Sequence, residues 1–202
     1  MTRLRSFKRN ETGASAAEFA LVLPIFLLLL LGTMDVGFYA WNINQSEKAT
    51  QMGTRWAVAT DMVPSGLATY SFATSGGIPQ GTVVPQSSFG GIRCTSGGCT
   101  CKAQCASGLT PGFNAASFAS ITQRMQQYKD DIEAGDITID YDWSGLGYAG
   151  DPNGPDVAPF VTIQVTGLEF QPVSTLLFGL QWGLPDTRYT LTAEDSEGAI
   201  AN

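Results

Sequence analysis

The sequence predicts an α+β fold class: a long N-terminal transmembrane and amphipathic helix packed on a small antiparallel β-sheet head, which carries a second helix. Two observations predict it. Residues 19–34 carry no charged side chain, and residues 137–193 contain three runs in which apolar and polar side chains alternate. Counted from residue 16, the apolar block approaches the roughly 20 residues that a helix needs to cross a bilayer. Alternation with a period of two is typical of half-buried strands.

The chain divides into three parts. Residues 1–13 form a basic leader, residues 14–62 form the transmembrane and amphipathic helix, and residues 63–202 form an exported globular head with a disulfide-rich loop. Because basic segments remain on the cytoplasmic side, we expect a single-pass protein with a cytoplasmic N-terminus. A secretory signal peptide has a similar layout, but it is shorter and ends at a small-residue cleavage site.

Each remaining element follows from a local pattern. Residues 63–112 are rich in Gly, Ser, Thr and Pro, which predicts loops with one weak strand at residues 82–84. Asn114 caps a second helix that ends near Gly135. The predicted strands cover residues 137–143, 161–166 and 189–193, and a proline-led apolar excursion covers residues 172–180. The buried stripe predicted for the amphipathic part of the first helix is Gln45, Ala49, Met52, Trp56 and Ala59.

The charge balance and the missing histidine exclude several function classes. The chain has 11 basic and 18 acidic residues and no histidine, for a net charge of −7. A nucleic-acid partner is not expected, because phosphate binding requires a basic surface. The absence of histidine excludes Ser-His-Asp and Cys-His catalysis and any histidine-ligated metal site. We therefore expect a non-enzymatic protein without a cofactor.

All the cysteines lie in one polar loop, at Cys94, Cys99, Cys101 and Cys105. An even number of cysteines in an exported protein predicts two disulfides, which have three possible connectivities. A zinc site is the alternative, but its ligands more typically come in paired C-x2-C units, which the spacing C-x4-C-x-C-x3-C lacks. We expect the disulfides to hold together a loop that is too polar to be stabilised by burial.

A turn at residues 151–156 brings oxygen ligands together. Asp151, Asn153 and Asp156 offer the carboxylate and amide oxygens that calcium prefers. The order of these residues does not follow the EF-hand pattern, which also needs a distal glutamate. The turn is therefore either a weak calcium candidate or a plain turn, and no other metal site is expected.

One acidic side chain, Glu18, stands at the threshold of the apolar block. A charged side chain in a membrane helix costs roughly 2.5 kcal/mol or more at the helix centre and less near the interface, so such residues are usually functional and paired. An uncleaved signal anchor gives no reason for this acid. Glu18 is therefore the residue where we expect function.

The residues around Glu18 resemble the processing site of type IV prepilins. In that family, a membrane peptidase cuts after a glycine that follows a short basic leader, and a glutamate is the fifth residue of the mature chain. Here Gly13 corresponds to that glycine, Ala14 to the new N-terminus and Glu18 to the fifth residue. The resemblance implies cleavage by a prepilin peptidase between Gly13 and Ala14.

The whole pattern is similar to that of the TadE-like minor pseudopilins of the tight-adherence (Tad, or Flp) pilus. In these proteins an aromatic residue follows the acid, as Phe19 does here, and a proline lies early in the apolar helix, as Pro24 does. Residues 52–57, Met-Gly-Thr-Arg-Trp-Ala, resemble the Glu-Gly-Ala-Arg-aromatic-Ala stretch that is common after the membrane helix in that family. The similarity covers residues 1–60, and beyond them only the order of elements agrees.

The resemblance implies a type IV pilin-like architecture and a structural role. The implied protein is a minor pseudopilin of the inner membrane, with a periplasmic or extracellular head, that primes or caps an adhesion pilus. The implied partners are the prepilin peptidase, other pilins and minor pseudopilins, the inner-membrane assembly platform and the lipid bilayer. Glu18 and Phe19 would form the assembly motif, in which Glu18 meets the free α-amino group at Ala14 of a neighbouring subunit.

One alternative belongs to another function class. If Glu18 is incidental and the leader stays attached, the chain is an uncleaved single-pass membrane-anchored extracytoplasmic binding module or adhesin, whose residues 63–112 contact a ligand. An exported enzyme is a further alternative, which the missing histidine disfavours. The state of the N-terminus separates the pseudopilin from the binding module, since only the pseudopilin begins at Ala14.

Overall fold

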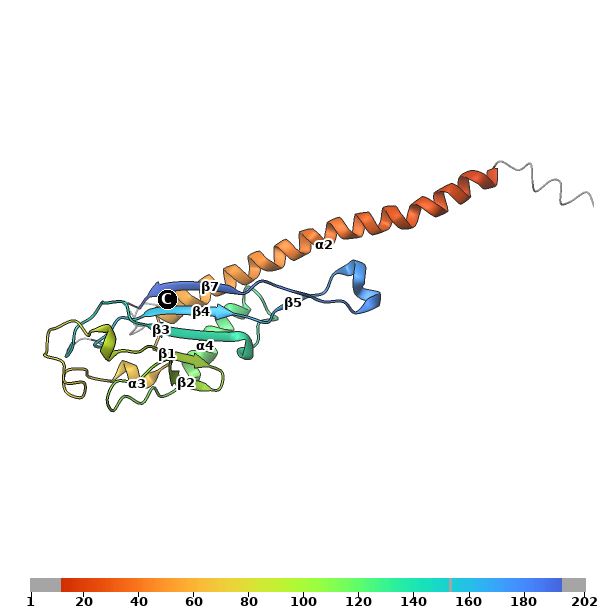
Figure 1. Ribbon diagram of the computed structural model, residues 1–202. Coiled ribbons are helices and arrows are strands. Elements are labelled where there is room, and N and C mark those ends of the chain that lie inside the picture. Colours follow the sequence, from red (N-terminus) through yellow and green to blue (C-terminus); the bar gives the residue numbers. More distant parts are fainter. Residues whose placement is uncertain (1–11, 153, 194–202) are drawn as a thin grey trace, which may run out of the picture. The chain divides into compact units, whose positions relative to one another are not determined.

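The computed structural model describes residues 12–152 and 154–193 (Figure 1). The chain forms two compact units. The first comprises Met1–Asn42 and Glu169–Trp182, and the second comprises Ile43–Leu168 and Gly183–Asn202. The segment Glu169–Trp182, which the sequence pattern assigned to the head, therefore groups with the N-terminal helix.

The predicted N-terminal helix is present as α2 (Thr12–Val58), which is 47 residues long. In the first unit its apolar side chains are exposed, for example Leu21 by 71% and Leu29 by 65%. The helix is long and apolar enough to cross a membrane. Pro24 lies within α2 without ending it, although proline removes one backbone donor from the helix.

The second unit contains a five-stranded antiparallel sheet in the order β2-β1-β3-β4-β7. Its strands are β1 (Ile92–Thr95), β2 (Gly98–Cys101), β3 (Ile137–Asp142), β4 (Phe160–Val165) and β7 (Thr187–Thr192). The last three confirm the strands predicted from alternation. The hairpin of β1 and β2 lies where the sequence predicted loops, and the strand predicted at residues 82–84 is wrong because the chain there is irregular.

The second predicted helix is α4 (Ala115–Gln126), and Asn114 caps it as expected, since its side chain accepts a hydrogen bond from the Ser117 N–H at 3.1 Å. The helix ends at Gln126 rather than near Gly135, and the chain turns through η2 (Ala134–Asp136) into β3. The second unit also contains two short elements, α3 (Ser65–Ala68) and η1 (Gln86–Ser88). Between β4 and β7 the chain forms β5 (Glu169–Phe170), η3 (Val173–Phe178) and β6 (Trp182–Gly183).

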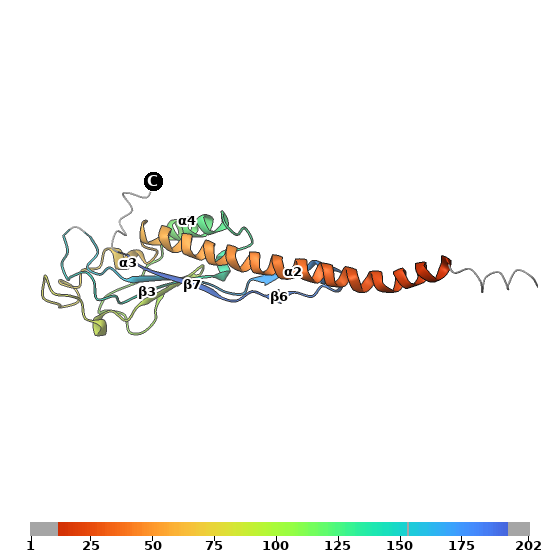
Figure 2. The same cartoon turned by 90° about the horizontal axis from the view of Figure 1, so that it is seen from above.

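The end of α2 packs with α4 against one face of the sheet (Figure 2). A Cβ added to Gly53 of α2 would lie 2.5 Å from Met125 Cγ in α4 and 3.5 Å from Ile163 Cδ1 in β4, so the three elements meet at this glycine. The predicted buried stripe of α2 is correct only at Ala49. The buried residues are instead small or hydroxylated, because only short side chains allow α2 to approach α4 and the sheet so closely. They are Ser46, Ala49, Thr50, Gly53, Thr54 and Ala57.

Candidate functional site

The predicted processing segment lies in the first turns of α2. Gly13 is helical and exposed, and a Cβ added to it would meet no atom within 4 Å. The predicted cut between Gly13 and Ala14 therefore falls at the start of the helix. Residues 1–11 of the leader lie outside the described residues.

Glu18 and Phe19 follow on α2, and both side chains are exposed. The neighbours of Glu18 at helical spacing, Leu21 and Val22, are exposed by 71% and 59%. Within the described part of the chain, Glu18 makes no salt bridge. Within the described residues of the chain, the acid thus stands alone on an apolar helix surface.

The opposite end of the apolar block holds an acid to which the sequence pattern gave no role. Asp35 is buried, with an exposed fraction of 1%. Its carboxylate accepts hydrogen bonds from the backbone N–H groups of Val173 at 2.7 Å and Ser174 at 2.9 Å, where η3 begins. The first N–H groups of a helix have no acceptor within it, so Asp35 caps η3 from another element. The sequence offered one signal, the proline-led segment that starts at Pro172.

Tyr39, one turn beyond Asp35, packs against two aromatic rings from the C-terminal part of the same unit. Its ring centroid lies 5.8 Å from that of Phe170 and 6.2 Å from that of Trp182, and both pairs are edge-to-face. Aromatic rings favour this arrangement because the positive edge of one ring meets the negative face of the other. Together with the Asp35 cap, the cluster fixes Glu169–Trp182 against α2.

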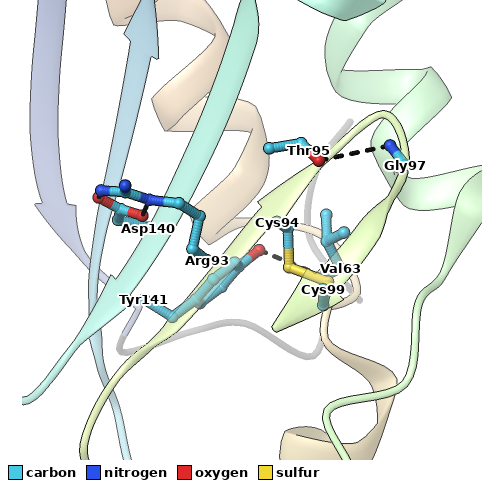
Figure 3. Close-up of a disulfide and its surroundings, with 8 residues drawn as sticks. All are labelled: Val63, Arg93, Cys94, Thr95, Gly97, Cys99, Asp140 and Tyr141. Carbon is cyan, nitrogen blue, oxygen red and sulfur yellow. Dashed lines mark hydrogen bonds and ion pairs between the residues drawn. A yellow bond between two sulfur atoms is a disulfide. The ribbon is translucent and has the colours of Figure 1, made fainter. Parts of the chain in front are cut away.

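The cysteines form two disulfides, as predicted, with the connectivity Cys94–Cys99 and Cys101–Cys105. Cys94 and Cys99 lie directly opposite each other in the β1–β2 hairpin, and Cys94 is fully buried. Figure 3 shows this disulfide close to Tyr141, whose hydroxyl accepts a hydrogen bond from the Val63 N–H at 3.2 Å. Burial raises the pKa of Tyr141, which therefore remains a neutral phenol. The first disulfide thus reaches the core of the second unit.

The other face of the sheet carries ion pairs. Arg93 donates two hydrogen bonds of 2.7 Å to the Asp140 carboxylate, and Lys102 Nζ lies 2.8 Å from the Asp142 carboxylate. Burial alone would raise the pKa of Asp140, but the hydrogen bond from Arg93 and the charge of Lys102 outweigh it, so this pKa is lowered below its ordinary value. Asp140 is therefore held as an ion-paired carboxylate.

The calcium candidate is only partly described, because Asn153 lies outside the described residues. Asp156 is 4% exposed, and its two carboxylate oxygens accept hydrogen bonds from the backbone N–H groups of Phe72 and Asp151. This acid therefore joins two loops. Among the residues that can be described, no group of three or more His, Cys, Asp or Glu side chains is arranged to hold a metal ion.

Comparison with known proteins bears on the N-terminal helix. Residues 13–55 match the family model described as TadE-like protein. The matched segment begins at Gly13, contains Glu18 and Phe19, and ends at Arg55 in the stretch after the apolar block. No curated protein and no solved structure matches the chain significantly.

Proposed function

We propose that this chain, whose residues 13–55 match the model of the TadE-like family, is a Tad-pilus protein, and specifically a minor pseudopilin that primes or caps this pilus. The chain is made as an inner-membrane precursor, and a prepilin peptidase cuts it after Gly13. The head is exported, and the subunit is structural rather than enzymatic. Its partners are other pilins and minor pseudopilins and the inner-membrane assembly platform.

One observation above all supports this proposal: the family match begins at Gly13, the residue after which the peptidase would cut. The match continues along a helix that is long and apolar enough to cross a membrane. The basic residues before Gly13 favour a cytoplasmic N-terminus, where the precursor would present its leader to the peptidase.

Glu18 acts as a positioning residue in this proposal. Cleavage frees the α-amino group of Ala14, so a neighbouring subunit presents a cation to the solitary acid. An unpaired carboxylate in an apolar helix bundle is strongly penalised, and pairing therefore selects the axial register that brings the two charges together. Ala14 and Glu18 are four positions apart along the helix, which corresponds to about 6 Å of rise. Paired subunits would be offset along the helix axis by about this distance.

The experiment compares Glu18→Ala with Glu47→Ala in a strain whose only copy of this protein is the variant. Glu47 is an exposed acid on the same helix, so its replacement controls for the loss of one charge. We expect Glu18→Ala to accumulate in the membrane and to be cut, but to yield few or no pili by electron microscopy. The Glu47→Ala strain should form pili normally.

Normal pili in the Glu18→Ala strain would contradict the role of this acid. Normal pili together with an intact leader would favour the membrane-anchored binding module instead, because neither the acid nor the freed amine would then be needed. Loss of pili in both variants would show that the effect is not specific to Glu18.

A further inference from the structure

Residues 170–182, here called the apolar arm, contain no charged side chain. The arm begins in β5, continues through η3 and ends in β6. It is the blue segment beyond β5 in Figure 1. Gly179 follows η3 with a φ of 62°, a left-handed conformation that glycine adopts without strain. The chain can therefore reverse sharply here and return beside its own path.

Contacts within the first unit fix the level of the arm along α2. Its base packs on Tyr39 through Phe170 and Trp182, whereas η3 begins at Asp35. Asp35 precedes Tyr39 by about one turn, or about 6 Å of rise. From its base, the arm therefore runs toward the apolar block, and η3 begins beside the outer end of that block.

The arm exposes apolar side chains, and the first backbone N–H groups of its helix η3 have an acceptor. Val173, Leu180 and Trp182 are exposed by 50%, 53% and 43%. The N–H groups of Val173 and Ser174 both donate to the buried Asp35 carboxylate. An unsatisfied backbone group in lipid costs several kcal/mol, so capping of this kind suits a segment that enters the edge of a bilayer.

We propose that the apolar arm lies in the membrane–water interface, with its exposed side chains in the lipid leaflet at the C-terminal end of the apolar block. The proposal rests on the membrane-spanning role of α2 proposed above. The arm and the apolar block belong to one unit, and both expose apolar side chains. Tryptophan favours the level of the lipid headgroups, and interfacial segments bury their apolar side by about 5–10 Å. The arm anchors the subunit to the bilayer at a second place, in addition to α2, and fixes how deeply α2 is inserted in the membrane.

The test uses the full-length chain in vesicles of phosphatidylethanolamine and phosphatidylglycerol. A photoreactive residue is introduced one site at a time as Leu180→benzoylphenylalanine, Leu28→benzoylphenylalanine or Val83→benzoylphenylalanine. These side chains are similarly exposed, by 53%, 62% and 55%, but they lie in the arm, the apolar block and the second unit. Mass spectrometry after irradiation measures the yield of lipid adducts. We expect high yields at Leu180 and Leu28 and a low yield at Val83.

The outcomes separate this proposal from the one on which it rests. Adducts at Leu28 without adducts at Leu180 would overturn the interfacial arm and leave the membrane span intact. No adduct at Leu28 would overturn the span and the arm together. Adducts of Leu180 with a second protein chain rather than with lipid would assign the arm to subunit contacts and overturn the proposal. Equal yields at Leu180 and Val83 would do the same, because lipid contact would not be specific to the arm.

A second pair of variants tests the cap. Asp35→Ala removes the acceptor of both η3 donors and should lower the lipid-adduct yield at Leu180 while leaving the yield at Leu28 unchanged. Asp61→Ala removes an exposed acid from the second unit and should change neither yield. An unchanged yield at Leu180 in Asp35→Ala would show that the cap does not hold the arm in lipid, against the proposal.

Discussion

Packing of α2 on the head depends on the absence of a side chain at Gly53. A Cβ at this position would lie 2.5 Å from Met125 Cγ and 2.6 Å from Met125 Sδ. Met125 is fully buried, so it has no solvent into which to move. Overpacking of this kind costs about 1–3 kcal/mol, against a gain of up to about 1 kcal/mol from the higher helix propensity of alanine. We expect Gly53→Ala to destabilise the protein by about 0–3 kcal/mol.

The background Met125→Ala supplies the matched control. This substitution alone should cost about 2–5 kcal/mol, because it leaves a cavity in the core. It also removes the atoms that the methyl group introduced by Gly53→Ala would strike, so Gly53→Ala should stabilise the Met125→Ala protein. The coupling free energy of the double-mutant cycle should be about 1–3 kcal/mol.

The free energies of unfolding are measured by denaturant titration of the full-length chain in detergent micelles. Equal effects of Gly53→Ala in both backgrounds, within about 0.5 kcal/mol, would refute the contact between α2 and α4 at this glycine.

Two further predictions concern the sheet. Tyr141→Phe leaves the buried Val63 N–H without its acceptor and should lower the free energy of unfolding by about 1–3 kcal/mol, and an unchanged value would contradict this hydrogen bond. The lowered pKa of Asp140 predicts a contribution to stability that is present above the ordinary carboxyl pKa of 3.8 and is lost as the pH falls through the lowered folded value. Between about pH 5 and pH 2, Asp140→Asn should therefore lose less stability than the wild type, whereas parallel losses would contradict the ion pair with Arg93.

The elements that the sequence predicted correctly are those with a local signal. The apolar block, the Asn114 cap and the alternation in β3 each occupy one contiguous stretch of chain. Strands β1 and β2 have four residues each, so the alternation of β1 is too short to stand out in a stretch rich in Gly, Thr and Cys. Strand β1 is stabilised by pairing with the distant strand β3, as in the ion pair of Arg93 with Asp140, which are 47 residues apart, and β2 adds to the sheet through β1.

The residues of the candidate site show the same difference between local sequence signals and contacts with distant parts of the chain. Gly13 and Glu18 stand in a short contiguous motif, so the sequence alone proposes them as site residues, and their roles stay predictions. The role of Asp35 could not be read from the sequence, because the amides that it caps lie 138 and 139 residues away. The turn at Asp156 looked like a cation site for the same reason, since its carboxylate accepts from Phe72, 84 residues distant.

Processing after Gly13 is tested most directly by the mass of the N-terminal peptide from cells that contain a prepilin peptidase. The wild type should begin at Ala14. Gly13→Val should keep the leader, whereas Gly32→Val should be cut normally, because Gly32 is another glycine of α2 at which an added Cβ meets no atom within 4 Å. A wild-type chain that still begins at Met1 in these cells would contradict the proposed processing, since the amine that Glu18 needs would not exist.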